Sequence, residues 1–218
     1  MKAESDRAIV LRTQPYRESS LLVHWLGQEH GLLHTVAKGV HRPHSPFQGR
    51  IDLFFLCRIQ YRPGRRSELG TLTEIELLDA FPALRKNLQA LRQAAWCARL
   101  ADHLLEPGVA LPPVFHSLEG VLSSLAHQGP HPSLILHFEV VLLRELGVLP
   151  HPSQTPLPQP VQKGLQTILS SPSPSPDSLP ATLLRPLAQW LGRILSHQFH
   201  LPLSSRDQAL GLSSLPSA

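Results

Sequence analysis

The chain has 218 residues, of which 42% are hydrophobic, and its formal net charge is +4 with a pI of about 9.5. This composition is ordinary for a soluble protein, and the length allows a core to form without disulfides or metal ions. The N-terminus MKAESDRAIV has no apolar core of a secretory signal, and no apolar run reaches the roughly 18 residues of a membrane span. Cys57 and Cys97 lie in apolar patterns and are expected to be small core residues, so we expect a cytoplasmic protein.

The first eighty residues are predicted to form strands. The predicted strands are AIVLR (8–12), SLLVHWL (20–26), LLHTVAK (32–38), IDLFFLCRIQY (51–61) and LGTLTEIELLD (69–79). In the fourth, every odd position from Ile51 to Tyr61 is apolar, which is the period of a strand with one buried face. Five short strands without interleaved helices predict a small antiparallel barrel of the OB-fold size, over residues 1–80.

Residues 81–218 are predicted to form a helical domain, which makes the fold class α+β. Apolar residues recur at helical spacing over 87–105, 114–128, 133–147 and 182–199. The third of these helices is apolar almost all round, so we expect it to be buried, beginning at Ser133 as N-cap and ending at Gly147. Nine of the 22 prolines lie in residues 150–180, which predicts a proline- and serine-rich linker interrupted by a short helix over 161–169.

Motifs for catalysis and metal binding are weak in this sequence. It contains no P-loop, no GxGxxG and no GxSxG. His41 and His44 form H-R-P-H, but the proline between them prevents a helical pair, so we interpret them as loop histidines rather than zinc ligands. Glu74 and Glu76 share one face of a strand, as carboxylates of a metal-dependent nuclease would. Exposed strand glutamates are more common than catalytic ones, and we expect no enzyme activity and no cofactor.

Basic residues concentrate between His34 and Arg66. Seven of these 33 residues are lysine or arginine and only Asp52 is acidic, which gives a local charge of +6. The predicted DNA-binding residues are Lys38, Arg42, Arg50, Arg58, Arg62, Arg65 and Arg66. On a barrel of this size such a surface favours contact with a phosphate backbone, with Tyr16, Phe47 and Phe54 as candidates for base stacking.

Several stretches of the chain resemble the RecO family of bacterial recombination mediators, which act with RecR and RecF in DNA repair. These stretches are AIVLRTQPYRESSLLV (8–23), HGLLHTVAKGVHRPHSPFQGRIDLF (30–54), LTEIELLDAF (72–81), FEVVLLRELG (138–147) and, more weakly, LPLSSR (201–206). The resemblance implies binding to single- and double-stranded DNA and annealing of complementary strands. It also implies help in loading RecA onto strands covered by single-strand-binding protein, in complex with RecR. Lys38 and Arg42 match the family's DNA-binding positions, and the protein would be associated with the nucleoid.

The chain departs from the family in two places. Many members carry four zinc-ligating cysteines after the helix that ends in LG, where this chain has HPSQTPLPQP and then PSPSPDS, so we expect this chain to bind no zinc. Members also have a basic pair before the Phe-Glu of the third helix that contacts the acidic tail of single-strand-binding protein. Leu136 and His137 stand in those positions, so the contact would rest on His137 or move to Arg144 or Arg99. The alternatives to the family reading are a protein-interaction adaptor with an incidental basic surface and a metal-dependent nuclease.

Overall fold

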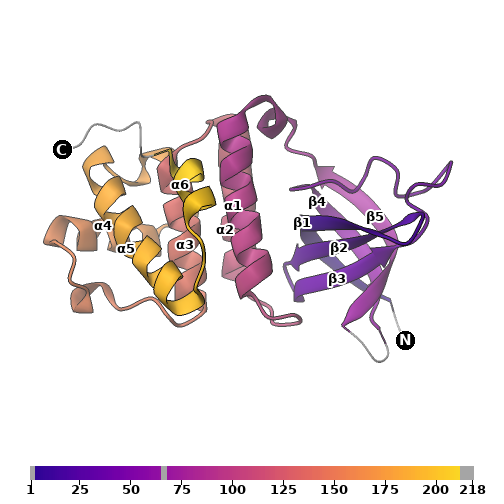
Figure 1. Cartoon of the computed structure of the whole chain (residues 1–218), viewed down its shortest axis with the longest axis horizontal. Coiled ribbons are helices and arrows are strands. Elements are labelled where there is room, and N and C mark those ends of the chain that lie inside the picture. Colours follow the sequence, from indigo (N-terminus) through magenta and orange to yellow (C-terminus); the bar gives the residue numbers. More distant parts are fainter. Residues whose placement is uncertain (1–2, 65–67, 212–218) are drawn as a thin grey trace. The chain divides into compact units, whose positions relative to one another are not determined.

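The computed structural model describes residues 3–64 and 68–211, which form two compact units (Figure 1). Residues 1–81 and 98–115 belong to the first unit, and residues 82–97 and 116–218 to the second. The strands are β1 (Glu4–Tyr16), β2 (Ser20–Gly27), β3 (Gly31–Ala37), β4 (Leu56–Arg62) and β5 (Leu69–Asp79). The α-helices are α1 (Leu88–Leu104), α2 (Pro112–His127), α3 (Pro132–Glu145), α4 (Gln159–Ser170), α5 (Ala181–Phe199) and α6 (Ser204–Leu210). Among the described residues, no helix combines the length and apolar character needed to cross a membrane.

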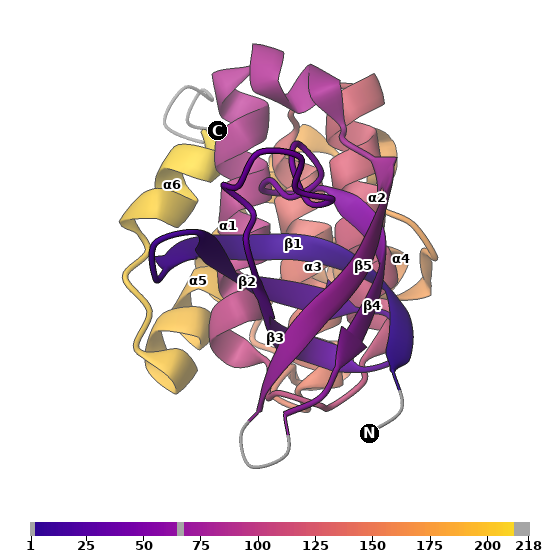
Figure 2. The same cartoon turned by 90° about the vertical axis from the view of Figure 1, so that its right-hand side faces the viewer.

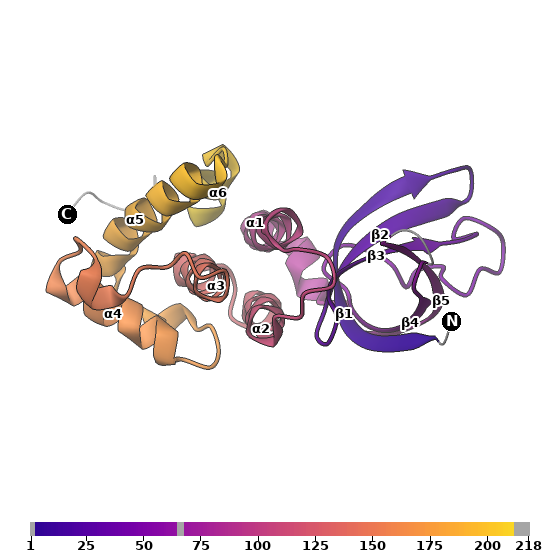
Figure 3. The same cartoon turned by 90° about the horizontal axis from the view of Figure 1, so that it is seen from below.

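The five strands close into a barrel in the order β1-β2-β3-β5-β4, with β4 pairing back onto β1 (Figure 3). All neighbours are antiparallel except β3 and β5, which pair in parallel from His34 opposite Leu69 to Val36 opposite Thr71. In Figure 2, β4 and β5 run side by side across the barrel. The predicted OB-type barrel followed by helices is therefore confirmed, as is the α+β class.

Alternating side chains fill the barrel. Its core cluster includes Val10, Trp25, Cys57, Ile59 and Tyr61. The indole of Trp25 donates to Thr35 Oγ1 at 2.9 Å, so its one polar atom is satisfied inside the core. The prediction that Cys57 and Cys97 are core residues is confirmed, since both are free, fully buried thiols. Burial raises the pKa of Cys57 to about 12, so this thiol stays protonated at neutral pH.

The fourth strand is shorter than predicted. The predicted strand over 51–61 begins only at Leu56, because residues 51–55 turn instead. Asp52 accepts from the Leu53 amide at 2.8 Å, and Phe54 takes a positive φ of 69°. The alternation therefore holds from Cys57 to Tyr61 but not before it, and Leu53 is exposed although it stands at an odd position.

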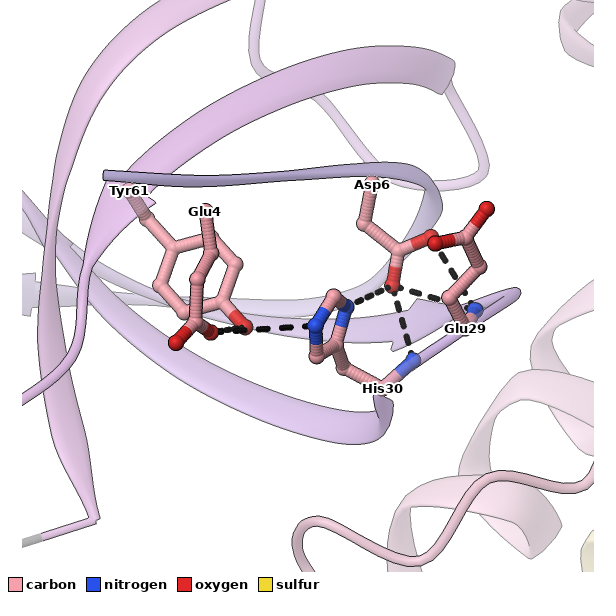
Figure 4. A network of polar contacts seen from close by, with 5 residues as sticks. All are labelled: Glu4, Asp6, Glu29, His30 and Tyr61. Carbon is pink, nitrogen blue, oxygen red and sulfur yellow. Dashed lines mark hydrogen bonds and ion pairs between the residues drawn. The ribbon is translucent and has the colours of Figure 1, made fainter. Parts of the chain in front are cut away.

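A buried carboxylate holds the turn between β2 and β3 (Figure 4). The side chain of Asp6 is fully buried and accepts from the backbone amides of Glu29 and His30, at 3.1 and 3.0 Å, and lies 3.0 Å from His30 Nδ1. Nearby, Tyr61 donates its hydroxyl to Glu4 at 2.8 Å, and His30 Nε2 lies 3.7 Å from the same carboxylate. Because Asp6 stands on β1, this network ties the turn to the neighbouring strand.

Replacing Asp6 by asparagine is expected to lower the free energy of unfolding by about 2 kcal/mol. The amide keeps one acceptor oxygen, but its NH₂ group would face backbone donors that the carboxylate now satisfies. Chemical denaturation followed by tryptophan fluorescence measures the effect. Glu29→Gln on the same turn changes an exposed side chain and should stay within about 0.5 kcal/mol of the unsubstituted protein. Equal stability of the two variants would contradict the role given to Asp6.

In the second unit, α3 is the central helix. Every residue from Ser133 to Leu143 is buried, which confirms that this helix lies in the core. Its N-cap is His131 rather than the predicted Ser133, because Pro132 occupies the first turn and the His131 ring accepts from the Ser133 amide. Gly147 follows the helix with a φ of 71°, as expected of a residue that ends a helix.

The proline-rich segment packs more closely than its composition predicts. The predicted short helix over 161–169 is present as α4, and its buried residues Val161, Leu165 and Ile168 belong to a helix that packs on α3 and α5. Leu157 and Leu179, on either side of α4, are also buried. Residues 150–180 thus contribute to the core of this unit, because the few apolar side chains among the prolines recur at helical spacing.

Candidate nucleic-acid interface

The pairing of β2 with β3 brings two separate loops to one end of the barrel. Leu21 stands opposite Ala37, so the turn between β1 and β2 lies beside the residues that follow β3. The His41 amide donates to the Ser19 carbonyl at 3.4 Å and joins the two loops directly. Residues 17–19 and 38–47 therefore form one surface, although the linear sequence separates them.

The loop that follows β3 is folded into turns rather than extended. Backbone amides donate to the carbonyl three residues earlier at Arg42, Ser45, Gln48 and Arg50. Gly39 and Gly49, near the two ends of the loop, have φ values of 70° and 71°, a backbone conformation that glycine adopts without strain. A Cβ at Gly39 would lie 3.3 Å from Arg42 Cδ, so the glycine leaves room for the arginine side chain to lie over it.

These two loops line a groove of about 820 Å³. We call it the basic groove; its wall residues include Tyr16, Arg17, Glu18, Ser19, Ser20, Lys38, Arg42, His44 and Ser45. Arg17, Lys38 and Arg42 are exposed and bring three positive charges, against one negative charge from Glu18. The serine hydroxyls add neutral hydrogen-bond donors. Such a concave basic surface suits a chain of phosphates.

Two of the predicted basic residues lie in the basic groove, and the others are placed elsewhere. Arg50 donates to the Ile75 carbonyl at 3.2 Å, so part of its guanidinium is committed to β5. Arg58 is ion-paired with Glu76, the residue opposite it on β5. Arg62 is exposed at the end of β4, opposite Thr71, and Arg65 and Arg66 lie outside the described residues.

Arg17 belongs to the basic groove but escaped the sequence prediction. It stands 21 residues before Lys38 and beside Glu18, so a count of charge along the chain gives it no weight. Its φ is 55°, which places it at the apex of the turn, and its guanidinium carbon lies 5.4 Å from the Tyr16 ring centre. The sequence could have indicated Arg17 if the predicted second and third strands had been paired as a hairpin. Such a pairing places the residues before the second strand beside the residues after the third.

The three candidate stacking residues differ in how far their side chains are exposed. Phe47 is 6% exposed and lies in the core of the barrel, where it anchors the loop. Phe54 is 4% exposed and lies before the first residue of β4, so its ring is buried and offers no face to a base. Tyr16 is half-buried in the wall of the basic groove. It is therefore the one of the three that a base can reach at this surface.

The predicted partner-binding residues in the helices also have distinct settings. His137 is 1% exposed and its Nδ1 lies 3.2 Å from Ser117 Oγ. Burial lowers the pKa of His137, so this side chain is neutral at physiological pH and lies beneath the surface. Arg144 is exposed and pairs with the adjacent Glu145 at 2.9 Å. Arg99, in the first unit, is exposed.

The pair of glutamates on β5 does not gather a metal-binding set in the described part of the chain. Glu76 is ion-paired with Arg58, and Glu74 stands opposite Gln60. Within residues 3–64 and 68–211, the one group of three side chains able to hold a metal ion is His24, His34 and Asp102. His41 and His44 are exposed in the loop and are not among them.

The fold defines a class of protein with an N-terminal OB-type barrel, a basic groove at one barrel end and a C-terminal helical unit. Two family models match this chain: Recombination protein O N terminal over residues 1–81, and Recombination protein O C terminal over residues 85–155. The chain belongs to the RecO family. The first match ends where β5 gives way to the helices.

Curated relatives agree with this assignment. The DNA repair protein RecO of Syntrophomonas wolfei is 34% identical over 145 residues, covering 66% of this chain and 57% of that protein. The proteins of the same name from Burkholderia pseudomallei and Tolumonas auensis are each 36% identical, covering 64% of this chain and 50% and 57% of their own lengths. The chain thus spans about half the length of the curated relatives it matches.

Proposed function

We propose that this chain is a DNA repair and recombination mediator that binds single- and double-stranded DNA without sequence preference and anneals complementary strands. The observation that carries the proposal is the basic groove, in which Arg17, Lys38 and Arg42 converge from two loops of an OB-type barrel. Phosphate contacts of this kind supply affinity without reading the bases, so both strands of a complementary pair can be held. Membership of a family whose matched relatives are named DNA repair proteins supports the same role.

The proposed mechanism makes and breaks no covalent bond. Neutralising phosphates on two strands lowers their mutual repulsion, so complementary bases held close together can pair. Tyr16 offers a face on which an unpaired base can stack beside the guanidinium of Arg17. The protein would act in the cytoplasm at the nucleoid.

In the cell the chain would act with RecR, and with RecF and RecA, on strands covered by single-strand-binding protein. Contact with the acidic tail of that protein requires cations at the surface. Because His137 is buried and neutral, Arg144 and Arg99 are the remaining candidates among the predicted residues. A tail contact in this chain would therefore use arginines at other positions than the family's basic pair.

A salt titration of binding to a labelled single-stranded oligonucleotide tests the proposal. If the three groove cations each meet a phosphate, the logarithm of the association constant should fall with the logarithm of salt concentration with a slope of about −2. Fluorescence anisotropy gives the slope, with RecR present in a parallel series. Binding that is absent at low salt, while capture of RecR survives high salt, would favour the adaptor alternative instead.

The same samples test the nuclease alternative. After incubation with magnesium or manganese, the labelled strand should remain intact on a denaturing gel, because Glu76 is engaged by Arg58. Cleavage that is lost in Glu74→Gln would replace the annealing proposal with a metal-dependent reaction.

A further inference from the structure

Two histidines and an aspartate meet on the outside of the barrel within the first unit. His24 on β2 and His34 on β3 stand directly opposite each other, and their ring centres are 4.2 Å apart. Asp102, in the last turn of α1, lies with Oδ1 2.6 Å from His24 Nδ1. One ligand atom from each of the three side chains lies within 4.8 Å of the others. Neither the basic groove nor the proposed annealing uses these residues.

We propose that His24, His34 and Asp102 form a zinc site, with two imidazoles and one carboxylate as ligands and a fourth position open to water. Imidazole nitrogen and carboxylate oxygen are ligands that Zn²⁺ takes in tetrahedral sites, and three protein ligands leave such a site open. With metal–ligand distances of about 2.0–2.1 Å, the ligand atoms of a tetrahedral site are about 3.3 Å apart. Side-chain rotations would adjust the three atoms to that spacing, which includes widening the 2.6 Å separation between His24 Nδ1 and Asp102 Oδ1.

The ligand atoms are available to a metal ion. The contact of 2.6 Å between His24 and Asp102 is held by a proton, which Zn²⁺ would replace. Among the residues that the structure describes, none hydrogen-bonds to the ring of His34.

The surroundings of the cluster carry charges of both signs. His34 lies in the wall of a pocket of about 230 Å³ that is also lined by Glu4 and Glu68. The carboxylates of these two glutamates attract cations to the pocket and so to His34. On the other side, Arg12 Nη1 lies 3.9 Å from Asp102 Oδ2 and opposes a cation. The Arg12 side chain is 57% exposed, so solvent screens its charge and it is able to move away.

A metal ion here would join three segments that the sequence keeps apart. It would clamp β2 and β3 to residues 98–104, a few residues before Gly108, whose amide donates to the Leu32 carbonyl at 3.1 Å. The expected consequence is added stability of the first unit. The site lies on different residues from the cysteine module of other family members, so the absence of those cysteines does not bear on it.

Calorimetric titration of the chelator-treated full chain with zinc chloride tests the site. One equivalent should bind, and saturating zinc should raise the melting temperature by roughly 5–10 °C. Co²⁺ in place of zinc should give the visible absorption of a tetrahedral complex. His34→Gln should weaken binding at least roughly tenfold, as Asp102→Asn should. Arg12→Gln should tighten it several-fold, because it removes the opposing charge.

His103→Gln is the matched control, since it removes an exposed imidazole next to Asp102 on the same helix. It should bind zinc as the unsubstituted chain does. If Asp102→Asn fails to fold, His34→Gln decides the outcome, because it removes no hydrogen bond among the described residues. The proposal is overturned if no stoichiometric site appears, or if folded His34→Gln binds zinc as tightly as the control. Neither outcome affects the DNA-binding proposal.

Discussion

Replacing Arg206 by alanine is expected to lower the free energy of unfolding of the helical unit by about 3–5 kcal/mol. Arg206 is buried on α6 and donates through Nε and Nη2 to the two carboxylate oxygens of Glu139 on α3, both at 2.7 Å. The indole of Trp96 donates to the same carboxylate at 2.8 Å. Without the guanidinium, a fully buried negative charge would keep only one neutral donor.

Urea denaturation followed by circular dichroism measures this effect. Arg193→Ala is a suitable control, because it removes an exposed arginine from α5 and should change stability by less than about 0.5 kcal/mol. The double variant Arg206→Met/Glu139→Gln should recover most of the loss, because it removes both charges and keeps an acceptor for Trp96. An Arg206→Ala protein that unfolds at the same urea concentration as the control would show that the pair contributes nothing.

Removing two cations from the basic groove is expected to weaken binding to single-stranded DNA at least tenfold at low salt. In Lys38→Ala/Arg42→Ala, two of the three exposed cations of the groove are lost. The magnitude of the salt slope should fall by about 1.4, the value for two phosphate contacts on a single strand. Stability should be unchanged, because both side chains are exposed.

Anisotropy titrations at several salt concentrations measure both quantities. Arg58→Ala/Arg62→Ala is the matched control: it removes two exposed arginines from β4, one of which is already paired with Glu76. We expect this control to bind more tightly than the groove variant. If the two variants lose equal affinity, the charge of the whole barrel rather than the basic groove holds the DNA.

Much of the barrel was predictable because strand periodicity is local. The alternation at Cys57, Ile59 and Tyr61 identified the buried face of β4 correctly, and the predicted bounds of β5 agree with the structure. The fully apolar pattern of 133–147 likewise identified the buried helix. These inferences need only the spacing of apolar side chains along one element, and the sequence gives that spacing directly.

The residues of the candidate site were less predictable. A count of charged residues along the chain does not show which of them lie on the same surface or which are paired with an opposite charge. Arg58 contributes to the basic count of its segment, but Glu76, 18 residues later, neutralises it across the sheet. Arg17 adds to the groove although its segment carries an adjacent acid. Phe47 was a candidate for stacking by its place in a polar loop, and instead it fills the barrel core. Each outcome depends on strand pairing and loop packing.

By itself, the sequence determined the strand and helix periods, the core cysteines and the resemblance to the RecO family. Only the tertiary structure decided which residues meet. It joined Glu139 to Arg206, from the stretches FEVVLLRELG and LPLSSR, in one buried ion pair. It also brought one polar atom each of His24, His34 and Asp102 within 4.8 Å of the others, across 78 residues of chain. The reason is physical: periodicity is a property of one segment, whereas a site requires side chains from several segments, whose meeting depends on register and packing.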